Sequence, residues 1–397
     1  QGNMIRTGRT GSGTQGVVSA GRAEAAEIGR EILAQGGNAI DAAVAVAFAL
    51  GVCAPNASGI GGGGFMMIRD GKTGKNVFLD FRENAPANAA PDMYTPKAPG
   101  SNYDKDLGNV YGGKSVGIPG DVAGLLYALE HYGTMTPEQV ISPAAKLARE
   151  GYVVTPLLHG DMAEHATQLK TYGDGWKIYL KDGQAWPVGS MISNPDLADT
   201  LDKIAAGGKD AFYKGEIADR IIAQVEKDGG VLSHADLENF TVRVLEPVRG
   251  TYRGYEIISS PPPSSGGTHV LQILNVLENF DISALEVNSV EYLHMFSEVF
   301  KLCYADRAAY MGDPHFVKVP LEGLLSKEYA REIAGLLRPV LEAENQAVHI
   351  GVSGSVAGKS FGVESDVYLV AEVWDGFGAL TQYYTSGITS IFDFPFG

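Results

Sequence analysis

Apolar residues recur at helical spacing in the first part of the chain. Between Arg22 and Ala34 they fall every three to four positions, and the glycines at 36 and 37 supply the left-handed stop that helix ends favour. Asn38 or Asp41 can cap a second helix, whose run to Ala54 has small apolar residues on every face. We therefore predict two helices, the second of them buried on most sides.

A β-hairpin is predicted behind a glycine-rich loop. The loop spans residues 58–65, and strands are expected at 66–69 and 77–82, joined by a turn at 72–75. The pattern farther along is mostly helical, with one more short strand at 255–259 that runs into a proline- and glycine-rich segment at 261–267. Helices are predicted at 120–131, 137–150, 217–227, 270–277 and 289–304.

Composition narrows the class of protein. The chain has 397 residues, of which 45% are hydrophobic and 20% charged, so it can bury a core. Its formal net charge of −16 does not suit a nucleic-acid partner, whose phosphates need clustered Lys and Arg. Its apolar run at 39–54 is interrupted by Asp41 and is shorter than the roughly 20 residues of a membrane-spanning helix. We expect no nucleic-acid partner and no transmembrane segment.

The two cysteines, Cys53 and Cys303, are too few for a disulfide scaffold or a cysteine-rich zinc site. Both are expected to be unpaired and to act as small buried apolar residues. No cofactor and no metal site are predicted.

The start of the chain suggests export. Residues 1–16 are rich in Gly and Thr and are predicted to form a flexible arm. The chain begins with Gln and shows no basic segment followed by an apolar one, so it is either cytosolic or has already lost a secretory signal. Gln rather than Met at position 1 favours the second interpretation, and we predict a periplasmic or secreted protein.

The four glycines at 61–64 invite comparison with phosphate-binding loops. Such a loop requires a following Gly-Lys-Ser/Thr and opens a helix, whereas this one lacks that pattern and leads into a strand. The glycines are instead predicted to let this backbone pass close to another backbone or to a ligand.

Arg82 is the candidate binding residue. It ends the second predicted strand beside the glycine loop, where a guanidinium suits bidentate capture of a substrate carboxylate. The alternative is an ion pair with Asp80 or Glu83, and position alone favours that alternative.

Several segments together resemble the gamma-glutamyltranspeptidases, in the same order and spacing. The likeness covers roughly residues 17–366. The segments that carry it are 36–45, 61–65, 80–83, 132–135, 261–267, 277–281, 304–307 and 312–314.

The resemblance implies an α/β fold, the αββα sandwich of the N-terminal nucleophile hydrolases. In that family one precursor cuts itself into a large and a small subunit, and the new N-terminal Thr attacks the gamma-glutamyl amide of glutathione. Its free α-amine serves as the general base, and the acyl group passes to water or to an amino acid. The family's substrate arginine falls on Arg82, and the implied partner is the small subunit of the same precursor.

The chain departs from the family at the expected processing junction. After a matching stretch that ends at Asp366, the family continues with Thr-Thr-His-x-Ser, whereas this chain has Val367. The nucleophile is therefore expected to be missing, together with the substrate and oxyanion contacts that the family places on the small subunit. Thr268, in a Gly-Thr-His string that looks like a processing site, is predicted to be structural.

The tail at 367–397 resembles instead the strand that bears the acid carboxylate in alpha-amylase superfamily glycosidases. Glu372 would match that general acid. A retaining glycosidase needs a second carboxylate about 5 Å away, and the Gly-x-Arg-x-Asp type of strand that carries it is not found upstream. A fused or misjoined fragment is the favoured interpretation, and a diverged small-subunit start is the other.

Three functional hypotheses follow. The leading one is the large-subunit part of a gamma-glutamyltranspeptidase at 17–366, which acts on gamma-glutamyl compounds such as glutathione together with a small subunit. The second is a catalytically inactive binding or scaffold chain that keeps Arg82 and the fold. The third is a fragment of a glycosidase fusion.

Overall fold

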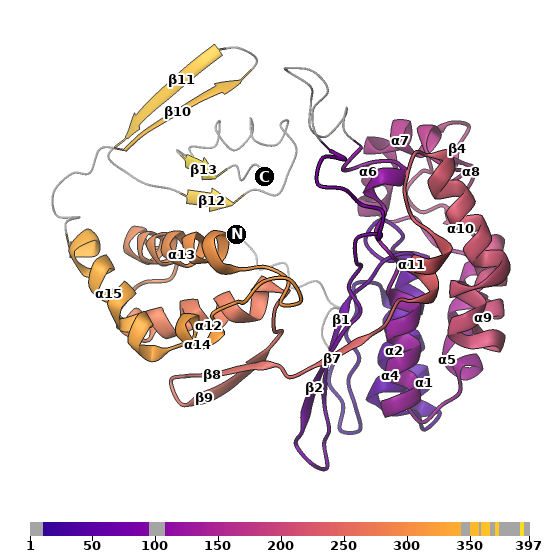
Figure 1. The fold of residues 1–397 in the computed structure, drawn as a ribbon, viewed down its shortest axis with the longest axis horizontal. Helices are drawn as coiled ribbons and strands as arrows, with labels where there is room; N and C mark the ends of the chain where they lie inside the picture. Colours follow the sequence, from indigo (N-terminus) through magenta and orange to yellow (C-terminus); the bar gives the residue numbers. More distant parts are fainter. Residues whose placement is uncertain are drawn as a thin grey trace. The chain divides into compact units, whose positions relative to one another are not determined.

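The computed structural model describes residues 11–94 and 108–342, and beyond them the backbone of four short strands (Figure 1). The chain divides into two compact units, Gln1–Leu245 and Glu246–Gly397. Residues 11–15 of the predicted arm are exposed, and residues 1–10 lie outside the described part. The predicted boundaries at 16 and 366 stay predictions.

The first two helices of unit 1 form as the sequence predicts. Helix α1 covers Ala23–Ala34 and ends with Gly36 at a φ of 92°, while the Gly37 amide donates to the Ile32 carbonyl at 3.0 Å. Helix α2 covers Ala39–Cys53, and Asn38 and Asp41 form a capping box at its start. Helix α1 packs along α2, and α2 in turn packs on α4 and α5 (Figure 1).

Asp41 is a buried carboxylate with an additional role. Its side chain accepts hydrogen bonds from the backbone amides of Thr134 and Met135 and from the Thr134 hydroxyl, at 2.7–3.0 Å. Burial alone would raise the pKa of Asp41, but these hydrogen bonds and that of Asn38 hold it below its ordinary value. One charged side chain therefore caps α2 and also fixes the loop that follows α4.

The predicted hairpin is present as strands β1 (Phe65–Arg69) and β2 (Asn76–Asp80), which pair antiparallel. A third strand, β7 (Arg243–Leu245), pairs with the other edge of β2, with Arg243 directly opposite Asp80. The prediction that the second strand continues to Arg82 is wrong, because the Asp80 carboxylate accepts the Arg82 amide at 3.0 Å and the ladder ends at Asp80.

The other elements of unit 1 are helices and two-residue strand pairs around this sheet. The helices α4 and α5 match their predicted ranges to within one residue, and α10 starts two residues earlier than predicted. The elements are η1 (Gly113–Ser115), α4 (Asp121–Tyr132), α5 (Pro137–Glu150), β3 (Tyr152–Val153), α6 (Pro156–Glu164), α7 (Ala166–Thr171), α8 (Trp176–Tyr179), β4 (Leu180–Lys181), β5 (Gln184–Ala185), β6 (Met191–Ile192), α9 (Pro195–Tyr213), α10 (Gly215–Lys227) and α11 (His234–Glu238).

Unit 2 begins with the hairpin of β8 (Val248–Tyr252) and β9 (Tyr255–Ser259). Helix α12 covers Ser265–Leu277, so the prediction that it starts at Val270 is wrong. The Ser264 hydroxyl accepts the Gly266 amide and caps the helix, which draws the two glycines into its first turn.

Helices α12, α13 and α15 enclose the core of unit 2, where Val276, Val299, Cys303 and Ile333 are buried. Helix α13 extends beyond the predicted range, to Tyr310. The remaining elements are η2 (Ile282–Ala284), α13 (Val290–Tyr310), α14 (Leu321–Leu324), α15 (Lys327–Glu342), β10 (Ile350–Val356), β11 (Lys359–Ser365), β12 (Val370–Glu372) and β13 (Ser390–Phe392).

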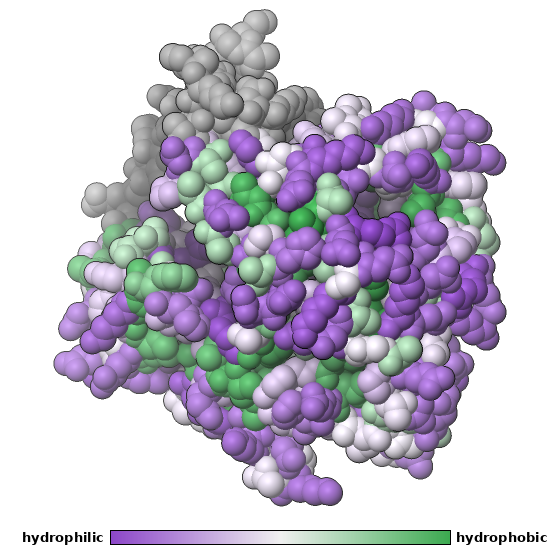
Figure 2. All heavy atoms as spheres, turned by 45° about the vertical axis from the view of Figure 1, so that its right-hand side comes forward, coloured by the Kyte–Doolittle hydropathy of each residue, from purple (hydrophilic) through white to green (hydrophobic). Residues whose placement is uncertain are grey.

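The surface carries many of the polar residues of the chain. Figure 2 shows a face covered largely by hydrophilic residues, with apolar residues in separate areas. None of the described helices is long and apolar enough to cross a membrane.

Both cysteines are free and buried, as predicted. Burial raises the pKa of the Cys53 thiol to about 11 and that of Cys303 to about 12. We expect a thiol reagent at pH 8 to react slowly with the native protein, because little thiolate forms, and to titrate two thiols after unfolding without reductant. A count of zero in the unfolded protein would reveal a disulfide and contradict the structure.

Candidate functional site

Arg82 lies two residues beyond the end of β2, on an exposed stretch of chain. Its guanidinium carbon is 5.9 Å from the centre of the Phe65 ring, which begins β1. This distance is that of a cation–π interaction.

The ion pairs considered for Arg82 are not formed. The Asp80 carboxylate instead pairs with Arg243, with Oδ2 at 2.7 Å from the Arg243 guanidinium, and its Oδ1 accepts the Arg82 backbone amide. Within the described part of the chain, neither Asp80 nor Glu83 is ion-paired with Arg82. Among the described residues the Arg82 guanidinium has no carboxylate partner, so the interpretation that position alone favoured, an ion pair with Asp80 or Glu83, is wrong.

Glycines surround the residue that precedes Arg82. A Cβ added to Gly63 would lie 2.6 Å from the Phe81 carbonyl oxygen, one on Gly120 would lie 1.8 Å from the same atom, and one on Gly124 would lie 2.0 Å from the Phe81 ring. The Phe81 amide also donates to the Gly64 carbonyl at 3.0 Å. This confirms that the glycine loop serves close backbone approach, and two further glycines, at the start of α4, complete the enclosure.

Asp121 is a site residue that the sequence did not indicate. It is the first residue of α4, and its amide donates to the Gly62 carbonyl at 3.0 Å. Burial, and secondarily the negative charge of Glu83, raise the pKa of Asp121 to about 6. The signal that could have found it is its position directly after Gly120, where a helix starts against the glycine loop.

Replacing Asp121 with Asn is expected to stabilise the protein at neutral pH. Below about pH 4 a carboxyl with a raised pKa is protonated in both the folded and the unfolded chain, so it does not change the free energy of unfolding. Between about pH 4 and pH 6 it ionises in the unfolded chain first, and the free energy of unfolding falls as the pH rises. Allowing for solvent screening and for the helix dipole, the Asp121→Asn gain in unfolding free energy at pH 7 should be on the order of 1–2 kcal/mol.

Urea unfolding at pH 4 and pH 7 measures this gain, which should be absent at pH 4. The matched control is Asp196→Asn, in the exposed first turn of α9. That variant should lose a few tenths of a kcal/mol, as expected for an anion removed from a helix N-terminus. Equal effects of both substitutions at pH 7 would contradict the burial argument.

The predicted structural role of Thr268 is supported by its placement inside α12, where it is fully buried. Next to it begins a buried chain of hydrogen bonds. The His269 Nδ1 contacts the Gln272 side chain at 2.7 Å, Gln272 donates to Asp306, and Asp306 accepts the Tyr329 hydroxyl at 3.0 Å. These contacts join α12, α13 and α15, which is a structural role.

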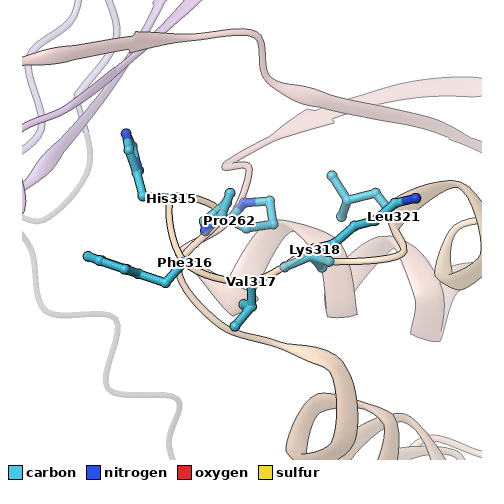
Figure 3. Close-up of a pocket in the computed structure, with 8 residues that line it drawn as sticks. Pro262, His315, Phe316, Val317, Lys318 and Leu321 are labelled. Carbon is cyan, nitrogen blue, oxygen red and sulfur yellow. The ribbon is translucent and has the colours of Figure 1, made fainter.

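A shallow hollow in unit 2 lies apart from this network. The loop between α13 and α14 lines it with Pro314, His315, Phe316 and Lys318, facing Pro262, and its volume is about 480 Å³ (Figure 3). No carboxylate lines it, and Phe316 is strongly exposed. Among the described residues no group of three or more His, Cys, Asp or Glu side chains is placed to hold a metal ion.

The remaining predicted site residues fall outside the described side chains. Asp366 and Val367, at the expected junction, lie outside the described residues. Only the backbone of Glu372 is described, at the end of β12, which pairs parallel with β13. A glycosidase-like role of Glu372 stays a prediction.

Comparisons with known proteins agree on one family. The family model described as gamma-glutamyltranspeptidase matches residues 25–360. The glutathione hydrolase proenzyme of Escherichia coli K12 is 43% identical over 321 residues, which are 81% of this chain and 55% of that protein. The glutathione hydrolase proenzyme of Bacillus subtilis strain 168 is 42% identical over 320 residues, 81% of this chain and 54% of that one.

A solved structure of the gamma-glutamyltranspeptidase of Helicobacter pylori is also similar. It has 40% sequence identity and a TM-score of 0.78, over 83% of this chain and 93% of that chain. The predicted fold class, the α/β fold of the N-terminal nucleophile hydrolases, is thereby confirmed. The chain spans about half the length of the curated relatives it matches.

Proposed function

This chain belongs to the gamma-glutamyltranspeptidase family, and from that premise we propose that it is the large-subunit part of an enzyme that cleaves gamma-glutamyl amides such as glutathione. The acyl group would pass to water or to an amino acid. The family model ends at residue 360, before the expected junction. We further propose a periplasmic or secreted location and a small subunit of the same precursor as the partner.

One observation carries the proposal: the exposed guanidinium of Arg82, which no described carboxylate neutralises, held beside the glycine loop. A gamma-glutamyl group carries its own α-carboxylate, which a guanidinium can bind through two parallel hydrogen bonds. Anchoring that end of the substrate leaves the gamma-amide free to meet a nucleophile. Arg82 therefore acts by binding and orientation, not by attack.

The nucleophile has to come from elsewhere. An N-terminal Thr supplies a hydroxyl together with a free amine as general base, and the expected position carries Val367. We propose that the chain by itself holds substrate without acyl transfer. The Val at this position also favours the second candidate, a binding or scaffold member without chemistry.

An assembly experiment tests the proposal. The chain is produced together with the small subunit of the Escherichia coli relative and assayed with gamma-glutamyl-p-nitroanilide, with a maltooligosaccharide as control. We expect hydrolysis of the anilide only when both parts are present. An assembled complex that binds glutamate without turnover would favour the scaffold function, and release of sugar by the chain would favour the glycosidase fusion.

The isolated chain is expected to stay whole. Self-cleavage in the family starts with attack by a Thr hydroxyl on the preceding carbonyl, and Val367 has no hydroxyl. Intact-mass measurement after prolonged incubation should show one species near 42.1 kDa. Two fragments with a break near residue 366 would show that the tail is aligned wrongly.

A further inference from the structure

Asp80 and Arg243 form a buried ion pair, and Asp80 lies two residues before Arg82. The Asp80 side chain is 0% exposed and the Arg243 side chain 16%, with 2.7 Å between Oδ2 and the guanidinium. The two residues are direct cross-strand partners of β2 and β7. The sheet register therefore brings this pair together.

We propose that Asp80 and Arg243 are positioning residues for Arg82: Arg243 occupies the buried carboxylate of Asp80, so that the Arg82 guanidinium stays open to a substrate carboxylate. Asp80 contributes a second effect, because its Oδ1 holds the Arg82 amide at 3.0 Å. The inference rests on the proposed function, in which Arg82 binds the substrate.

A buried carboxylate requires a partner of opposite charge. An ionised carboxylate without a partner is costly away from water, so it recruits the nearest available cation. With Arg243 in place, Asp80 Oδ1 accepts the Arg82 amide and Oδ2 lies 2.7 Å from the Arg243 guanidinium, a charge contact without hydrogen-bond alignment. Without Arg243, the nearest cation along the chain is Arg82, two residues away, and its guanidinium would be neutralised inside the protein.

The proposed role of the Asp80–Arg243 pair predicts a different result from mutation than a purely structural ion pair does. A purely structural ion pair loses stability when either partner is removed, and removing the second partner as well gives no specific recovery of ligand binding. If Arg243 instead keeps Asp80 from pairing with Arg82, deleting Arg243 weakens ligand binding only while Asp80 keeps its charge. Charge removal at Asp80 should therefore rescue the loss of Arg243.

The first test uses the chain itself, labelled with ¹⁵N-arginine, and follows the side-chain Nε–H signal of Arg82 by NMR without ligand. In Arg243→Met the signal should shift and show restricted guanidinium rotation, because Arg82 pairs with Asp80. In Asp80→Asn/Arg243→Met it should return to the native position. Arg249→Met, which removes an arginine from an exposed pair with Glu256, is the matched control and should leave it unchanged.

The second test titrates the same variants with L-glutamate by calorimetry. Arg243→Met should weaken binding at least about 10-fold, and the double variant should recover to within about 3-fold of the native chain, as expected for coupled neighbours. Thermal unfolding confirms that each variant is folded. Arg243→Gln, which keeps a donor toward Asp80 without the charge, replaces Arg243→Met if that variant does not fold.

The outcomes separate the two proposals. An unchanged Arg82 signal in folded Arg243→Met or Arg243→Gln overturns the positioning role, as does a double variant no better than the single one. A signal that shifts and recovers as expected, in a chain that never binds glutamate, supports the control of Arg82 by Asp80 and Arg243 and counts against the proposed substrate.

Discussion

Replacing Arg82 with Ala is expected to weaken binding of L-glutamate by on the order of 2–5 kcal/mol, because a charge-assisted bidentate contact is lost. The fold should survive. The Arg82 side chain is exposed, its described contact is the cation–π contact with Phe65, and its hydrogen bond to Asp80 comes from the backbone amide, which Ala retains. Calorimetry on the native and variant chains, with thermal unfolding alongside, measures both quantities.

Arg82→Lys is the matched control. A Lys keeps the positive charge but offers a point charge in place of the planar fork of donors. We expect intermediate affinity, clearly below that of the native chain and above that of Arg82→Ala. Equal affinity of the native chain and Arg82→Ala, in a preparation that binds glutamate, would reject Arg82 as the anchor.

Local sequence signals account for much of the fold. The left-handed Gly36, the capping box of Asn38 and Asp41, and the hairpin of β1 and β2 each depend on residues within a few positions of one another. Such signals also have limits. The two glycines at 266 and 267 argue against a helix start, but the Ser264 cap outweighs them and α12 begins at Ser265.

The candidate site was only partly predictable. Position and family resemblance single out Arg82. Whether its guanidinium is free of Asp80 depends on Arg243, which lies 161 residues later (243 − 82) and reaches Asp80 through the pairing of β7 with β2. The raised pKa of Asp121 likewise depends on burial and on Glu83. Neither the register of a distant strand nor the burial of a helix start can be obtained from local spacing.

The glycine enclosure of Phe81 leads to the second large effect: Gly120→Ala is expected to destabilise the protein by on the order of 3 kcal/mol. The new Cβ would lie 1.8 Å from the Phe81 carbonyl oxygen and 2.8 Å from the Phe240 ring. The first of these atoms belongs to the backbone, so no side-chain rotation relieves the overlap. Either α4 or the 80–83 segment must move.

Movement of the 80–83 segment would also displace Arg82, which follows Phe81 directly. We therefore expect Gly120→Ala to lose glutamate affinity together with stability, whereas Arg82→Ala loses affinity alone. Urea unfolding and calorimetry on the same samples distinguish these patterns.

Gly160→Ala is the matched control, in the same unit and on the exposed side of α6. A Cβ there would meet nothing within 4 Å. Since Ala is the better helix former, this variant should gain about 0.5–1 kcal/mol and bind glutamate as the native chain does. If Gly120→Ala were as stable as Gly160→Ala, then α4 would tolerate a side chain against Phe81, and the glycines would not be what holds Arg82 in place.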